Sequence, residues 1–90
     1  MDSNANNNTI NNTQLYNNNG YGAYIHNSSS NNVINNTQVY NNNGQGISLS
    51  NYANDNTINN TQVYNNASFG IFFEYRSDNN KINSGSFFNN

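Results

Sequence analysis

Few side chains in this 90-residue sequence could carry acid–base or metal chemistry. The chain has one histidine, His26, one methionine, Met1, and no cysteine. Copper and zinc sites need several such ligands close together, so the sequence predicts no metal site and no cofactor. The acidic residues are expected at different positions of the repeat described below: Asp2, Asp55, Glu74 and Asp78.

A second set of side chains recurs every 24 residues and could bind by stacking instead. It forms an aromatic file beside a glutamine file: Tyr16, Tyr40, Tyr64 and Phe88, with Gln14, Gln38 and Gln62. Aromatic rings on an outer surface can stack on a carbohydrate, on another copy of the protein, or simply on one another. The sequence leaves these three uses open.

The 24-residue spacing belongs to a repeat that runs through the whole chain. It links two further files: Ile10, Ile34, Ile58 and Ile82, and Asn11, Asn35, Asn59 and Asn83. The run NNTQVYNN occurs twice, and no insertion or deletion breaks the register. Asparagine supplies 29 of the 90 residues, a composition typical of disordered, aggregation-prone chains. Fixed-period self-similarity indicates a solenoid instead.

Each repeat contains three short segments with strand-like alternation, separated by Asn, Gly and Ser. One segment centres on Ile10, a second points Thr13 and Leu15 inward, and a third has the pattern GAYI. No segment has a 3.6-residue period, which excludes helical solenoids. We therefore predict an all-β parallel β-helix with three strands per 24-residue coil, about 3.75 coils and roughly 18 Å tall. One domain, 1–90, would hold coils 7–30, 31–54, 55–78 and a partial coil 79–90.

The same alternation predicts which side chains form the core. The expected inward residues are Ile34, Val39, Ile47, Leu49, Ile58, Val63, Ile71 and Phe73. The file that begins at Asn11 is expected at a turn, with its amides bonded to one another along the axis. Stacked amides and aromatic rings stabilise cross-β assemblies, so such ladders would compensate for the low aliphatic content.

The stretch from Asn7 to Asn32, NNTINNTQLYNNNGYGAYIHNSSSNN, resembles the parallel β-helix repeats of pectin-lyase-like proteins. Similar coils occur in archaeal and bacterial surface proteins and in periplasmic copper-accessory proteins. The resemblance covers essentially the whole chain. It implies right-handed coiling, in line with the usual hand of parallel crossovers, and an extracellular or cell-surface location.

Enzymes of that family cut sugars on the outer face of the sheets with acidic and basic residues. The resemblance would place His26, Ser50 and Glu74 there, one per coil. His26 and Glu74 would then be about 10 Å apart, too far for an acid–base pair. Calcium-assisted lyases need several acidic residues beside a basic one. We therefore expect no enzyme, and solvated polar side chains at these positions.

Charge and composition restrict the partners. Two basic residues, Arg76 and Lys81, cannot form the footprint that nucleic acid or an anionic membrane requires. No apolar run reaches membrane-spanning length. Threonine files, such as Thr13, Thr37 and Thr61, resemble ice-ordering arrays but are single and therefore read as strand residues. Sequons at Asn11, Asn27, Asn35, Asn59 and Asn66 matter only if the chain is secreted.

The first and last repeats carry no segment that resembles a cap. Uncapped coils present unpaired backbone groups, and the usual protections, charge and proline, are scarce at 7% and zero. We therefore expect a structural β-solenoid that associates with itself, stacking head to tail into filaments. The alternative is an excised part of a larger extracellular β-helix protein, serving as a polysaccharide-binding module or a rigid spacer.

Overall fold

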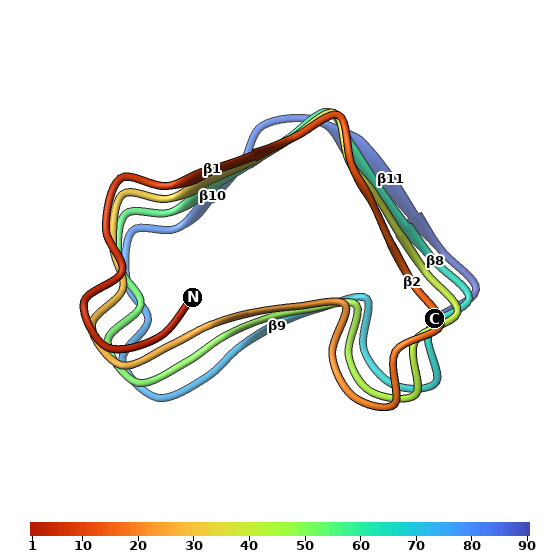
Figure 1. Cartoon of the computed structure of the whole chain (residues 1–90), viewed down its shortest axis with the longest axis horizontal. Helices are drawn as coiled ribbons and strands as arrows, with labels where there is room; N and C mark the ends of the chain where they lie inside the picture. The colour runs from red at the N-terminus through yellow and green to blue at the C-terminus, as the bar shows by residue number, and fades with distance from the viewer.

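The computed structural model describes all 90 residues as a stack of coils built from eleven short strands. Figure 1 looks along the stacking axis, where successive coils superpose as a three-sided outline with a loop at two corners. We name the three sheets A, B and C. Sheet A contains β1 (Thr9–Asn11), β4 (Val33–Asn35), β7 (Thr57–Asn59) and β10 (Lys81–Ile82). Sheet B contains β2 (Gln14–Tyr16), β5 (Gln38–Tyr40), β8 (Thr61–Tyr64) and β11 (Gly85–Phe88). Sheet C contains β3 (Ala23–Ile25), β6 (Ile47–Leu49) and β9 (Ile71–Phe73).

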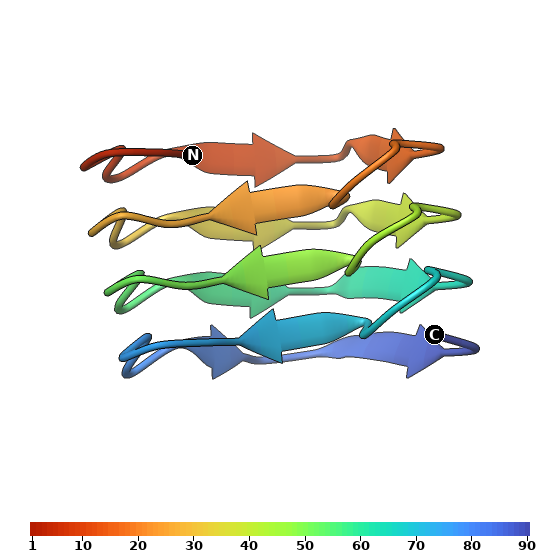
Figure 2. The ribbon, with the colours of Figure 1, turned by 90° about the horizontal axis from the view of Figure 1, so that it is seen from below.

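All strand pairs are parallel, and every pair keeps the 24-residue register. Ile10 pairs with Ile34, Ile34 with Ile58, and Ile58 with Ile82. Figure 2 shows the coils as level, evenly spaced layers, with the N-terminus in the first layer and the C-terminus in the last. The shortest extent of the molecule is 17 Å. The prediction of an all-β parallel solenoid with three strands per coil is confirmed.

Asparagine residues form the turns at two corners of the coil. The corner between sheets A and B has a left-handed residue at Asn12, Asn36 and Asn60, with φ of 54°, 49° and 46°. The residue that follows sheet B is also left-handed, at Asn17, Asn41 and Asn65. Among residues with a side chain, Asn enters this conformation most readily, because its short amide can bond to nearby backbone. In the last coil Ser84 occupies the A–B corner without a positive φ, and the chain bulges out of the common path there (Figure 1).

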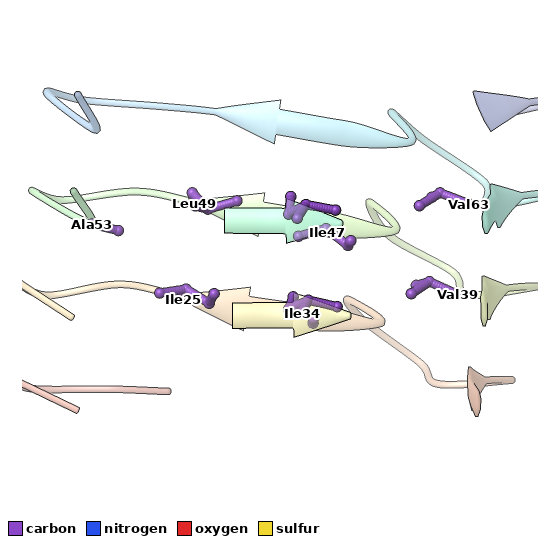
Figure 3. Close-up of a cluster of buried hydrophobic side chains, with 9 residues drawn as sticks. Ile25, Ile34, Val39, Ile47, Leu49, Ala53 and Val63 are labelled. Carbon is purple, nitrogen blue, oxygen red and sulfur yellow. The ribbon is translucent and has the colours of Figure 1, made fainter. Parts of the chain in front are cut away.

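The core is a narrow column of aliphatic side chains between the three sheets (Figure 3). Its buried members are Ala23, Ile25, Ile34, Val39, Ile47, Leu49, Ala53, Ile58 and Val63. Six of the predicted inward residues are among them, and Ile71 packs partly buried against the column. Phe73, also predicted to point inward, is 43% exposed and does not belong to the buried column. Phe73 is in register with buried Leu49, but sheet C ends at β9 and no further strand covers it.

Close stacking at the start of sheet C depends on glycine. A Cβ at Gly46 would lie 2.6 Å from the Gly70 carbonyl oxygen and would also clash with Cγ1 of Val63. Gly22 meets the equivalent atoms of Val39 and Gly46 one coil earlier. The repeated glycine therefore reflects a lack of space between coils at this point.

Replacing Gly46 with alanine should destabilise the fold by about 1–3 kcal/mol, because the added methyl group overpacks a rigid backbone contact. The matched control is Gly20→Ala, where a Cβ would meet no atom within 4 Å. Thermal unfolding followed by circular dichroism compares the two variants with the parent. Equal melting temperatures for the two variants would contradict the proposed crowding.

Candidate functional site

Two files of asparagine side chains run inside the coils, parallel to the stacking axis. The first, which we call the Asn42 ladder, consists of Asn18, Asn42, Asn66 and Asn90. Oδ1 of Asn42 accepts bonds from the Asn18 backbone N–H at 3.1 Å and from its side-chain amide at 2.8 Å. The Asn42 amide donates to Asn66 Oδ1 at 2.9 Å and to the Leu15 carbonyl at 3.1 Å. Asn42 and Asn66 are buried, so these bonds satisfy amides that water cannot reach.

The second file, the Asn32 ladder, consists of Asn8, Asn32, Asn56 and Asn80. Backbone N–H groups of the first three donate to Oδ1 of the asparagine one coil later, each at 2.8 Å. The side-chain amides of Asn56 and Asn80 also donate to the carbonyls of Ser29 and Ala53. The Asn32 amide nitrogen is buried without a hydrogen-bond partner. The amides of Asn56 and Asn80 donate to the carbonyl 27 residues earlier, and for Asn32 that residue is Ala5. This ladder is therefore less completely bonded in its first step than in its later ones.

Sequence reasoning missed both inner ladders. Their members recur at the 24-residue step, so the signal was present, but asparagine fills so many positions that the buried ones do not stand out. The direction of bonding is common to both ladders: each backbone N–H donates to the Oδ1 of the next coil. Within these two ladders, each coil therefore offers backbone N–H donors to the following coil and Oδ1 acceptors to the preceding one.

The asparagine file expected at a turn lies on the outer face instead. Asn11, Asn35 and Asn59 are the last residues of β1, β4 and β7, one position before the corner. The Asn35 amide donates to Asn11 Oδ1 at 2.9 Å, and the Asn59 amide donates to Asn35 Oδ1 at 2.8 Å. Asn83, in the exposed last coil, makes no side-chain bond of this kind. In the neighbouring isoleucine file, Ile34 and Ile58 are buried, Ile10 is partly buried and Ile82 is exposed.

The aromatic file forms a continuous outer row on sheet B. Ring centroids are 5.0 Å apart for Tyr16–Tyr40 and Tyr40–Tyr64 and 5.1 Å apart for Tyr64–Phe88, and the planes agree within 3°. Partial desolvation raises the pKa of the Tyr40 phenol above 10.0, and repulsion from the phenolates of Tyr64 and Tyr16 raises it further. Within the row, neighbouring rings cover each other's faces. Only the faces of the two end rings that point away from the row are free to stack on a sugar.

His26 directly follows β3 of sheet C, is partly exposed, and pairs with a residue that we did not expect. Its Nε2 is 3.4 Å from Asp2 Oδ1, and its ring stacks on Tyr24 with centroids 4.1 Å apart. Hydrogen bonds from Asn27 and Ser3, with a smaller contribution from the His26 charge, lower the pKa of the Asp2 carboxyl below 3.8 despite some desolvation. The expectation that the acidic residues fall at different positions of the repeat is wrong for Asp2 and Glu74, which are three 24-residue steps apart and share the position of His26 and Ser50.

The other two residues of that file do not join His26. Ser50 is buried and its hydroxyl lies 3.0 Å from the Tyr24 hydroxyl, while Glu74 is exposed. No three His, Cys, Asp or Glu side chains gather anywhere in the molecule. Along this file, Asp2 and His26 form a pair at one end, the buried Ser50 hydroxyl lies in the middle, and the exposed Glu74 carboxylate lies at the other end.

The threonine file faces inward. Thr37 and Thr61 are buried, and their hydroxyls donate to the carbonyls of Asn35 and Asn59 at 2.9 Å. These hydroxyls close the A–B corner and are not exposed to order water. Buried Asn66 likewise has both amide hydrogens engaged, by Asn90 Oδ1 and the Val39 carbonyl, so it is no glycosylation acceptor in the folded chain.

The two ends of the stack carry complementary open groups. At the first coil, Oδ1 of Asn8 and Oδ1 of Asn18 accept no hydrogen bond, although their equivalents in later coils do. At the last coil, the backbone N–H groups of Asn80 and Asn90 donate to nothing, although those of Asn56 and Asn66 do. Acceptors of the inner ladders are thus open at one face and donors at the other.

Parallel sheets at a fixed coil length, with ladders inside and outside, define a structural β-solenoid. The family model described as "Right handed beta helix region" matches residues 1–90, and the chain belongs to this family. No curated protein and no solved structure matches the chain. The structure contains no helix long and apolar enough to cross a membrane.

Proposed function

We propose that this chain is a structural β-solenoid that associates with copies of itself head to tail and so builds a filament. The observation that carries the proposal is the polarity of the inner ladders. Asn80 and Asn90 present unpaired backbone donors at one face, and Asn8 and Asn18 present unpaired Oδ1 acceptors at the other. Contact between two first coils would bring acceptors against acceptors, so only the head-to-tail arrangement continues the ladders.

The register favours the same arrangement. If a second copy continues the 24-residue step, its Ile10 follows Ile82 and its Tyr16 follows Phe88. In a stack of residues 1–90 alone, four coils would need 4 × 24 = 96 positions, so six positions of the coil would be unfilled at each joint. The joint is therefore continuous along sheets A and B and interrupted beside sheet C, which makes it the weakest point of a filament.

Electron microscopy of the purified 90-residue chain tests the proposal. We expect unbranched filaments that diffract at the strand spacing of about 4.8 Å. A variant with Ile10→Lys and Ile82→Lys brings like charges together at every joint and should remain monomeric. The control, Gln38→Lys with Gln62→Lys, adds the same charge to the side of the middle coils and should still form filaments.

The outcomes separate the alternatives. Filaments that persist in the Ile10→Lys, Ile82→Lys variant would contradict end-to-end stacking and point to lateral assembly through the aromatic row. A parent chain that forms only irregular aggregates would favour the second candidate, a rigid spacer within a larger extracellular β-helix protein, because open coil edges accept further coils of one chain equally well. Polysaccharide binding has less support, since the rings of the aromatic row cover one another. We also propose that the chain is not an enzyme.

A further inference from the structure

Three phenols of the aromatic row are aligned in a way that no other tyrosines of the chain share. Tyr16, Tyr40 and Tyr64 occupy the same position in successive coils, with rings parallel within 3° and centroids 5.0 Å apart. Because the three residues also share the repeat register, each ring is nearly a parallel copy of the next, displaced by one coil. The row is open to solvent, and Tyr16 at its end is 48% exposed. An oxidant in solution can reach it.

We propose that this row is a site of oxidative cross-linking, where a one-electron oxidant joins neighbouring phenols into dityrosine and so ties successive coils together covalently. Each phenol loses one electron to the oxidant and its hydroxyl proton to water. The two phenoxyl radicals couple through the carbons ortho to oxygen, forming one carbon–carbon bond. The ortho hydrogens then move to the oxygens as the rings regain aromaticity. The net change is a loss of two electrons and two protons per cross-link.

The other tyrosine pairs are less suited to this coupling. Tyr52 and Tyr75 meet edge to face with centroids 5.8 Å apart, so their ortho carbons are not aligned. The rings of Tyr21 and Tyr24 are closer, at 4.7 Å, but are tilted by 46°. The Tyr24 hydroxyl also lies 3.0 Å from Ser50 Oγ, and its ring stacks on His26. The aromatic row is therefore favoured by the parallel alignment of its rings rather than by the distance between them.

The row ends in a residue that cannot couple. Phe88 stacks on Tyr64 at 5.1 Å but has no hydroxyl group to give a phenoxyl radical. Cross-links are therefore confined to Tyr16, Tyr40 and Tyr64, and they connect β2, β5 and β8. This proposal depends only on the stacking within one chain and not on filament formation.

The test is photo-oxidation of dilute protein with tris(bipyridyl)ruthenium and persulfate, followed by dityrosine fluorescence and mass spectrometry of the proteolysed monomer. We expect cross-linked peptides joining Tyr40 to Tyr16 or to Tyr64. Tyr40→Phe keeps the ring stack but leaves the two remaining phenols about 10 Å apart, so most of the fluorescence should be lost. The matched control, Tyr52→Phe, removes an exposed tyrosine outside the row and should keep the parental yield.

A gain-of-function variant completes the test, because Phe88→Tyr extends the row and should add a cross-link between Tyr64 and position 88. Circular dichroism verifies that all variants remain folded. Parental dityrosine yield in Tyr40→Phe would overturn the proposal. So would cross-links that map mainly to Tyr21–Tyr24 or Tyr52–Tyr75 in the parent chain.

Discussion

Replacing Ile58 with aspartate should remove a large part of the folding stability. Ile58 is 1% exposed and lies at the centre of sheet A, between Ile34 and Ile82. A carboxylate there would be desolvated among aliphatic side chains with no cation to pair with, which costs about 4–5 kcal/mol or forces the acid to be protonated. Small domains have a total stability of only about 5–15 kcal/mol.

Thermal and urea unfolding, followed by circular dichroism, measure the effect. The control is Gln62→Asp, which puts the same charge on the solvent-facing side of the neighbouring sheet and should change stability by less than about 0.5 kcal/mol. If Ile58→Asp melts together with the parent, the assignment of the inner face is wrong.

Replacing Asn42 with leucine should be nearly as damaging, although it puts an apolar side chain of similar size into the interior. The Asn42 side chain takes part in four hydrogen bonds, to Asn18, Asn66 and the Leu15 carbonyl. Leucine would leave the buried Asn66 oxygen and the Leu15 carbonyl with fewer donors. Each buried polar group left unsatisfied costs about 1–3 kcal/mol, so we expect a loss of about 3–5 kcal/mol.

The outer ladder supplies the control for this prediction. Asn35→Leu removes one amide bond to Asn11 and one from Asn59, but water reaches these groups and can replace the lost partners. We expect it to cost less than about 1 kcal/mol. Urea unfolding of the two variants gives the comparison. Equal losses would mean that burial does not distinguish the inner ladder from the outer one.

The 24-residue spacing was enough to predict the strands, their register and most of the core. Strict recurrence of Ile10 and Tyr16 leaves only one pairing that keeps identical residues adjacent in every coil. The spacing could not tell which asparagines lie inside. Asn42 is buried because the left-handed residue before it, Asn41, turns the chain so that the next side chain points inward. That is a property of the backbone path, and neighbouring residues of the same type hide it.

Two other differences have equally local causes. Phe73 has the sequence pattern of a core residue, and its exposure follows only from its place in the last strand of sheet C. The Asp2–His26 pair was within reach of the sequence, since the two residues are 24 positions apart like every other stacked pair. The sequence identified the aromatic row as a candidate surface. That its rings cover one another could be learned only from the ring orientations in the structure.

The constant register has a consequence for how the chain folds. Each strand pairs only with residues 24 positions away, so no backbone ladder can begin until a loop of that length has closed. Loop closure over 24 residues costs about 2.8 kcal/mol of chain entropy beyond a constant term. The first two coils must meet this cost without a template, whereas each later coil adds to an edge that already exists. Folding should therefore be nucleation-limited and slow for a chain of this size, with rapid zipping from coil to coil once a nucleus has formed.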